Sequence, residues 1–339
     1  MSPTPAVPEL RPLAMGEMID RAASFWRAHL KPLFVLNFGF SLVNYIAVKA
    51  VTLAIQRLSP ALYASEAQRA QQDPSEMLPQ LGTSLALWSV MAVVIIWVYW
   101  LASMATSRYV LASQLGEPTS PADGLRRGFS RVGAMTGAYL LSLGWSTLVT
   151  VLLLIPGAIF VGLAALAASS GSNTLGVVAG VVGALLAGLG LLAAMLWYFL
   201  RFLLLPPVLA MEDLGAWAAF RRSGALLSGR VEPGFMGRVV VRAMILFTVV
   251  SLILLSVGLV SGLPSYLVVA SHGSFFDPAT MARTPQYLLV PAELLQVVVQ
   301  SLFTPINFAF CALFYLDMRV RREALDLERK LEASPTLAA

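Results

Sequence analysis

The stretch VGAMTGAYLLSLGWSTLVTVLLLIPGAIFVGLAALAASSGSNTLGVVAGVVGALLAGLGLLAAMLWYFL, residues 132–200, contains no Asp, Glu, Lys or Arg. A helix needs about 20 apolar residues to cross the hydrocarbon core of a bilayer, so this stretch is too long for one span. The polar run SSGSNT at 169–174 divides it, as a turn between two helices would. The sequence therefore predicts a transmembrane hairpin, with spans at about 134–168 and 175–205.

Further apolar windows lie on both sides of this hairpin, at about 32–55, 84–108, 239–262 and 287–316. Charged residues make up 12% of the chain and hydrophobic residues 58%, whereas a soluble domain carries roughly 25% charge. This composition excludes a disordered chain and makes a soluble enzyme improbable. Long Leu-rich and Gly-rich runs favour helices over barrel strands. We therefore predict an all-α, polytopic integral membrane protein with six transmembrane helices.

The basic residues predict the orientation of these helices. In a six-span topology both termini share one side, and only four of the 23 lysines and arginines fall on the opposite side: Lys49, Arg57, Arg69 and Arg283. Because basic loops remain in the cytoplasm, we expect both termini to be cytoplasmic. This explains the net charge of +5 without nucleic acid as a partner. The N-terminus lacks the apolar core of a cleavable signal peptide.

Three short amphipathic segments on the cytoplasmic side, 15–30, 121–132 and 214–227, each precede two spans. A shift of 95 residues aligns the Arg-Arg pair at 126–127 with the pair at 221–222. One interpretation is a threefold parallel repeat of interfacial helix plus hairpin. The alternative is that any basic amphipathic helix at a membrane surface has this composition. The expected divisions are a disordered N-terminus (1–11), a membrane domain (12–316, with units of about 12–110, 118–205 and 214–316) and a charged cytoplasmic tail (317–339).

Arginines in these segments and in the tail are candidates for contacts with anionic lipid headgroups or protein partners. A basic side chain near an anionic surface contributes about 1 kcal/mol. The candidates are Arg21, Arg27, Arg126, Arg127, Arg221, Arg222, Arg319, Arg321 and Arg322. Acidic residues near them, Asp317, Glu212 and Asp213, are expected to form ion pairs on the same face.

Four segments resemble a known family: RPLAMGEMIDRAASFWRAHLKPLF (11–34), LIPGAIF (154–160), VLAMEDLGAWAAFRRSGALLSGR (208–230) and ALFYLDMRVRREALDLE (312–328). Together they resemble the bacterial glycerophosphoryl diester phosphodiesterase membrane domain. The resemblance implies a six-helix protein of the bacterial inner membrane. The soluble catalytic domain that gives the family its name needs metal-binding His and Glu residues, and this chain has two histidines. The resemblance therefore implies no catalytic residue.

The last span carries polar residues on one face. Glu293, Gln296, Gln300, Thr304 and Asn307 fall within an arc about 80° wide, along roughly 21 Å of helix. A similar arc in the first span holds Asn37, Ser41, Asn44 and Thr52. Polar residues inside a membrane mark either a path for a solute or contacts between helices. Both interpretations of the last span remain open at this stage.

Two charges lie near the outer ends of these two spans. Lys49 in the first span and Glu293 in the last form a hypothetical intramembrane ion pair. The alternative is that Lys49 extends to the outer lipid headgroups. In the fourth span, Gly176, Gly180, Gly183 and Gly190 form a stripe of small residues that predicts close helix packing, inside the bundle or between protomers.

The sequence contains no pattern that predicts catalysis, a metal or a cofactor. Cys311 is the single cysteine, which excludes an intrachain disulfide and a Cys-based zinc site. Ser271, His272 and Asp277 crowd one outer loop, and we interpret them as solvated loop residues rather than a triad. Our first functional hypothesis is a non-enzymatic scaffold or complex subunit that binds protein partners or a second copy through its arginine-rich helices. The alternative is a transporter or channel for a lipid or small solute, which predicts a cavity lined by Gln296, Gln300 and Asn307.

Overall fold

The computed structural model describes residues 11–64, 74–274, 277–325 and 327. Within these ranges the regular structure is helical, apart from one isolated antiparallel bridge between Arg230 and Arg238. Six helices are long and apolar enough to cross a membrane, which confirms the predicted all-α, multi-pass architecture. They are α2 (Leu30–Leu58), α4 (Pro74–Gln114), α6 (Val132–Ser169), α7 (Asn173–Phe202), α10 (Val239–Ala270) and α12 (Gln286–Glu323).

Short helices form at the three predicted amphipathic segments: α1 (Met15–Ala28), α5 (Pro121–Ser130) and α9 (Ala216–Leu227). The remaining short elements are η1 (Pro60–Tyr63), α8 (Leu205–Met211) and α11 (Pro278–Arg283). Helix α12 continues through Glu323, so the predicted boundary between membrane domain and tail at 316/317 divides one continuous helix. Residues 1–10 and 328–339, which include most of the predicted N-terminal and tail regions, lie outside the described residues.

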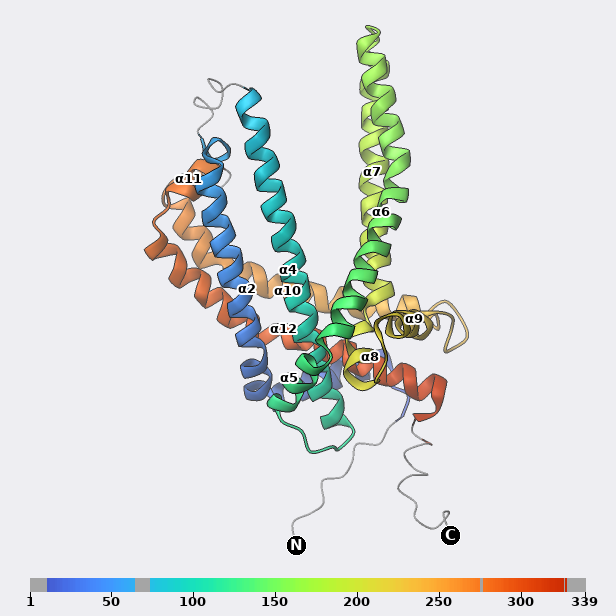
Figure 1. Cartoon of the computed structure of the whole chain (residues 1–339). Coiled ribbons are helices and arrows are strands. Elements are labelled where there is room, and N and C mark those ends of the chain that lie inside the picture. Colours follow the sequence, from blue (N-terminus) through green and yellow to red (C-terminus); the bar gives the residue numbers. More distant parts are fainter. Residues whose placement is uncertain (1–10, 65–73, 275–276, 326, 328–339) are drawn as a thin grey trace, which may run out of the picture. The chain divides into compact units, whose positions relative to one another are not determined.

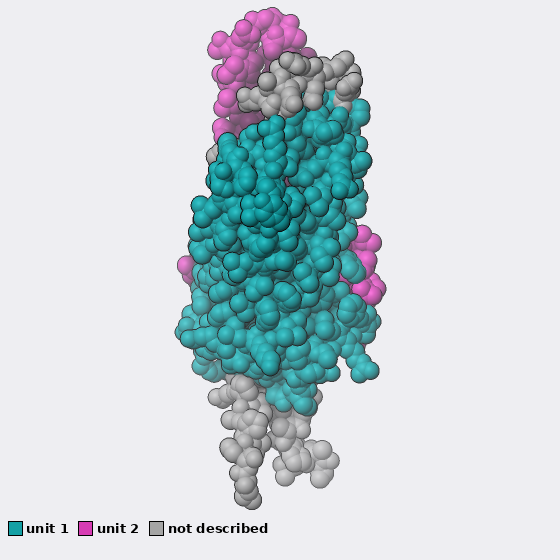
Figure 2. All heavy atoms as spheres, turned by 90° about the vertical axis from the view of Figure 1, so that its left-hand side faces the viewer, with its two compact units in different colours: residues 1–130, 245–339 teal, residues 131–244 magenta. Residues whose placement is uncertain are grey.

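The chain forms two compact units, coloured separately in Figure 2. Unit 1 comprises residues 1–130 and 245–339, and unit 2 comprises residues 131–244. In unit 1, α12 packs against α1, α2 and α4, and α2 packs against α4 (Figure 1). The core of this unit follows the second half of α12, where residues 308–318 are all buried. This apolar packing sets the positions of α2 and α12 relative to each other.

Helix α5 packs closely on α4 because two of its glycines face that helix. A Cβ atom at Gly124 would lie 2.5 Å from the carbonyl oxygen of Ala105, and Gly128 faces Leu101. The helix begins at a capping box, since Ser120 and Asp123 each accept a hydrogen bond from the other's backbone N–H. The hydrogen bonds from Ser120 lower the pKa of the exposed Asp123 carboxyl. Asp123 therefore stays ionised beside the helix N-terminus.

A buried ion pair joins the N-terminal segment to the end of α12. Asp317, whose side chain is fully buried, accepts hydrogen bonds from the backbone N–H of Leu13 at 2.8 Å and from Nε of Arg321 at 2.9 Å. Arg321 in turn donates to the carbonyl oxygen of Leu13 at 2.9 Å. Trp26 of α1 adds a second link, donating from its indole N–H to the carbonyl oxygen of Leu302 at 2.7 Å. The N-terminal segment and α1 therefore contact α12 at two positions, near Asp317 and near Leu302.

Unit 2 is built on the hairpin of α6 and α7, which lie side by side (Figure 1). The predicted glycine stripe of α7 faces α6 within this hairpin. A Cβ at Gly190 would lie 2.4 Å from the carbonyl oxygen of Leu153, and a Cβ at Gly183 would lie 2.9 Å from Val161. Gly176 and Gly180 face Ala164 of the same helix. The sequence allowed these glycines to pack either inside the bundle or between protomers. In the structure they pack inside the bundle, against α6.

Two acidic residues after α8 pair with arginines of unit 2. Glu212 pairs with Arg222 of α9 at 3.0 Å, and Asp213 lies 3.7 Å from Arg131 at the start of α6. A third pair joins Arg242, which is 4% exposed, to Glu232 at 3.3 Å. The acidic pair that follows α8 therefore connects α9 and α6 at one end of the hairpin.

Candidate functional site

A cavity of about 520 Å³ lies in unit 1, lined by residues of α2, α4, α10 and α12. We call it the chamber. Its polar wall comes from the two helix faces singled out in the sequence. Helix α2 contributes Asn37, Ser41, Asn44 and Thr52, and α12 contributes Glu293, Gln296, Gln300 and Thr304. Two polar stripes from opposite ends of the chain thus face one volume.

The two charges of the chamber form a direct ion pair. Lys49 Nζ lies 2.9 Å from Oε1 and 2.7 Å from Oε2 of Glu293. Tyr45, one turn before Lys49 on α2, donates its hydroxyl proton to Oε2 at 2.9 Å. The two charged side chains keep 18% and 25% of their surface exposed, so the pair remains accessible from the chamber. The hypothetical Lys49–Glu293 contact is therefore present in the structure.

Other polar residues of the two stripes differ in their partners. Asn37 donates to Thr106 of α4 at 3.2 Å and to the carbonyl oxygen of Leu33 at 2.9 Å, so it serves packing as well as lining. Asn44 Oδ1 is buried and has no hydrogen-bond partner among the residues that the structure describes. A buried acceptor without a partner is unfavourable by about 1–3 kcal/mol. The rest of the Asn44 side chain lines the chamber, whereas this oxygen is buried away from it.

Asn307 is the one member of the predicted α12 face that does not line the chamber. Its amide donates at 2.6 Å to the hydroxyl of Tyr99 on α4, and Tyr99 itself lines the chamber. Cys311, one turn further on, is buried in the core. The polar face thus changes from chamber wall to helix contact toward the end of α12.

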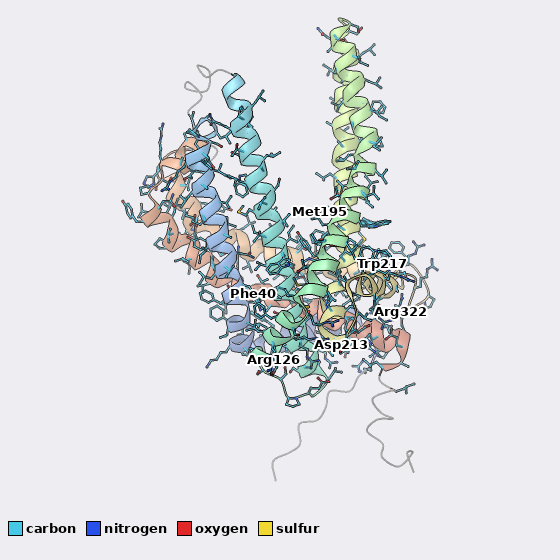
Figure 3. The ribbon with its side chains drawn as sticks, in the orientation of Figure 1. Phe40, Arg126, Met195, Asp213, Trp217 and Arg322 are labelled. Atoms are coloured by element: carbon cyan, nitrogen blue, oxygen red, sulfur yellow. The ribbon has the colours of Figure 1, made fainter. Side chains whose placement is uncertain are left out.

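Aromatic residues form the part of the chamber wall that the sequence did not indicate. Phe40, labelled in Figure 3, and Tyr45 come from α2, Tyr99 from α4 and Phe308 from α12. Tyr45 could have been found, because it lies four residues before Lys49 and so on the same helix face. Tyr99 carried no such signal, since α4 has no polar stripe.

We expect that exchanging the charges of Lys49 and Glu293 restores part of the stability that each single charge reversal removes. Lys49→Glu and Glu293→Lys should each lower the free energy of unfolding by about 2 kcal/mol, below the 3–5 kcal/mol of fully buried pairs because both groups are partly exposed. The double variant should regain at least half of the loss. Thermal unfolding in detergent measures this.

The matched control is Glu17→Lys, which breaks the exposed pair with Arg11 and should cost at most about 0.5 kcal/mol. A double variant no more stable than the weaker single variant would show that the contact contributes nothing.

Eight of the nine candidate arginines fall into two groups by exposure. Four are half-buried and bind within the chain: Arg21 donates to Gln114, Arg222 pairs with Glu212, Arg319 with Glu323 and Arg321 with Asp317. Arg27, Arg126, Arg221 and Arg322 have exposed side chains, and Figure 3 labels Arg126 and Arg322. Arg126 and Arg127 line a surface groove of about 490 Å³ together with Arg108 and Asp123. The first group stabilises the fold, and the exposed arginines can still reach an anionic partner.

Ser271, His272 and Asp277 do not assemble as a triad in the part of the loop that the structure describes. The His272 ring contacts Ser271 Oγ at 3.1 Å and the carbonyl oxygen of Val268 at 2.8 Å, whereas Asp277 caps α11 by accepting from the N–H of Ala279. Within the described ranges no three His, Cys, Asp or Glu side chains gather as a metal site.

Comparison with family models, curated proteins and solved structures finds no match. The resemblance to the glycerophosphoryl diester phosphodiesterase membrane domain therefore stays a prediction.

Proposed function

We propose that this chain is a transporter or channel that admits a small polar solute or a lipid headgroup to the chamber. The chamber supports this because it joins two polar stripes and an ion pair inside helices that are otherwise apolar. Contacts between helices account for Asn37, Tyr45 and the Lys49–Glu293 pair, but they do not require an open volume beside these side chains. Charged and amide groups inside a membrane are costly, and transport paths are a common reason for them.

Water access to the chamber tests the proposal. Cys311 is the single cysteine, so Cys311→Ala gives a background in which Gln300→Cys is the only thiol. We expect this thiol to react with a membrane-impermeant methanethiosulfonate reagent in intact cells or in inverted vesicles.

Leu295→Cys is the matched control, since Leu295 lies on the same helix, is 51% exposed and lines an apolar groove instead of the chamber. It should stay unlabelled in lipid. Equal inertness of both thiols from both sides would overturn the proposal.

We further propose that the protein resides in a bacterial inner membrane with both termini in the cytoplasm. The distribution of Lys and Arg supports this orientation. Single cysteines at Arg126 and Arg221, both exposed on the short helices, should react only from the cytoplasmic side. Reaction from the outside would show that the proposed orientation is wrong.

A scaffold or complex subunit remains the second candidate function. The exposed aromatic side chains on the short helices favour it: Phe129 is 60% exposed on α5, and Trp217, labelled in Figure 3, is 59% exposed on α9. Beside the exposed Arg126 and Arg221, these rings would suit anionic headgroups or a partner surface. Co-purification in mild detergent followed by mass spectrometry tests it, and a lone monomer would argue against it.

Packing within each unit also supports the proposed parallel repeat. The shift of 95 residues that aligns the arginine pairs places Gly124 and Gly128 of α5 on Ala219 and Ser223 of α9, and all four are buried. Helix α5 packs on α4, which precedes it, and α9 packs on α7 and α8, which precede it. These corresponding buried positions support the repeat, and α9 also packs on α6.

A further inference from the structure

The chamber carries one positive and one negative charge. Of the described residues that line it, Lys49 and Glu293 are the two that are charged at neutral pH. A ligand with a net charge would leave one charge uncompensated in a low-dielectric region, which costs several kcal/mol. The chamber therefore favours a ligand whose net charge is zero. This inference rests on the proposed function.

A net charge of zero fits either an uncharged molecule or a zwitterion, and the ion pair favours the zwitterion. An uncharged ligand needs neither Lys49 nor Glu293, although both are costly to keep among apolar helices. A zwitterion can exchange partners with the pair: its cation takes Glu293 and its anion takes Lys49. Every charge then remains paired before and after binding.

Groups beside the pair add contacts for such a ligand. Tyr45 already donates to Glu293 at 2.9 Å. Gln296 lines the chamber one turn along α12 from Glu293, and its amide offers both a donor and an acceptor. The volume of about 520 Å³ lies within the range of about 300–1,000 Å³ typical of small-molecule pockets.

We propose that the chamber binds a small zwitterion, in which an ammonium and a carboxylate or phosphate group lie a few ångströms apart. Its ammonium end replaces Lys49 on Glu293, and its anionic end pairs with Lys49. This chemistry occurs in free amino acids and betaines, and also in the headgroup of phosphatidylethanolamine.

Thermal unfolding of the full chain in detergent, followed by tryptophan fluorescence, tests the proposal with defined probes. The probes are L-alanine, glycine betaine, the uncharged polyol myo-inositol and the anion acetate, each at saturating concentration. A separate arm compares micelles supplemented with phosphatidylethanolamine or with the anionic phosphatidylglycerol. We expect a zwitterionic probe to raise the unfolding temperature by several degrees, about 3 °C or more, while inositol and acetate do not.

The double variant Lys49→Met with Glu293→Leu is the matched control. Replacing a buried ion pair by apolar residues of similar size is often neutral for stability, so this variant should fold and lose the shift. If it does not fold, Gln296→Leu serves instead, and it should at least halve the shift. A rise in unfolding temperature with phosphatidylethanolamine but with no soluble probe would identify the bound zwitterion as a lipid headgroup.

Two results would overturn the inference. A shift with inositol or acetate but with no zwitterion would assign another ligand class, and the absence of any shift would remove the zwitterion. Either failure is distinct from that of the proposed function, because the labelling of Gln300→Cys reports water access without any ligand.

Discussion

Asp317→Ala is expected to lower the free energy of unfolding by about 4 kcal/mol. The change removes the acceptor for the N–H of Leu13 and leaves Arg321, whose side chain is 11% exposed, without its carboxylate. Breaking one partner of a buried ion pair typically costs 3–5 kcal/mol, about an order of magnitude more than an exposed pair. Thermal unfolding in detergent measures the loss, and limited proteolysis should show earlier cleavage before α1.

Glu323→Ala is the control on the same helix. It breaks an i,i+4 pair with Arg319 in which both side chains are more than a fifth exposed, so the expected cost is about 0.5 kcal/mol. Similar losses in the two variants would mean that burial of Asp317 does not decide the effect. The double variant Asp317→Leu with Arg321→Met should recover part of the stability, because no unpaired charge is left.

Gly190→Val is expected to cost about 3 kcal/mol by forcing α6 and α7 apart. The new Cβ would lie 2.4 Å from the carbonyl oxygen of Leu153 and 3.1 Å from its carbonyl carbon. Both are backbone atoms of a regular helix, so neither can move away as a side chain would. Overpacking of this kind usually costs 1–3 kcal/mol, and the rigid neighbour places this site at the upper end.

Gly188→Val is the control for helix propensity. Gly188 lies two residues away on α7, and a Cβ there meets nothing within 4 Å. Both substitutions replace glycine by valine inside the same helix, so their difference isolates the contact with Leu153. We expect Gly188→Val to stay within about 0.5 kcal/mol of the unaltered protein. An equal loss in both variants would contradict close packing at Gly190.

The positions of the six long helices could be predicted because charges are costly inside hydrocarbon. Their ends could not, because hydropathy reports the depth of the apolar layer and a helix can continue past it. Helix α4 begins at Pro74 and ends at Gln114, beyond the predicted 84–108, and it includes Arg108 in its last turns. Helix α12 continues for seven residues after the predicted end at 316, through Asp317 and Arg321.

Helix periodicity predicted the two polar stripes but not their meeting. The arcs on α2 and α12 follow from a rotation of 100° per residue, whereas their pairing depends on packing between segments about 250 residues apart. Asn307 shows the limit of the arc. Pro305 lies between Thr304 and Asn307 and interrupts the backbone hydrogen bonds of α12, and Asn307 contacts Tyr99 instead of lining the chamber. A prediction that assumes an ideal helix does not include this difference in the position of Asn307.

Burial explains why the arginines could not be sorted from sequence. Arg321 and Arg322 are neighbours with the same predicted role, yet Arg321 is held by Asp317 and Leu13 while Arg322 is exposed. Which of two adjacent side chains turns inward depends on the acidic residue one turn away on the helix. The contrast between these two residues follows from contacts that only the folded chain creates.

Helix α12 connects the chamber to the N-terminal segment, which lies on the cytoplasmic side in the proposed topology. Glu293 and Gln300 of this helix line the chamber, and Asp317 near its C-terminal end accepts a hydrogen bond from the N–H of Leu13. If α12 tilts when a ligand binds, the segment before α1 that contacts Asp317 is expected to move with it. A fluorophore attached just before Leu13 would then report ligand binding in the chamber. A bulky fusion at the same position would slow the movement of α12.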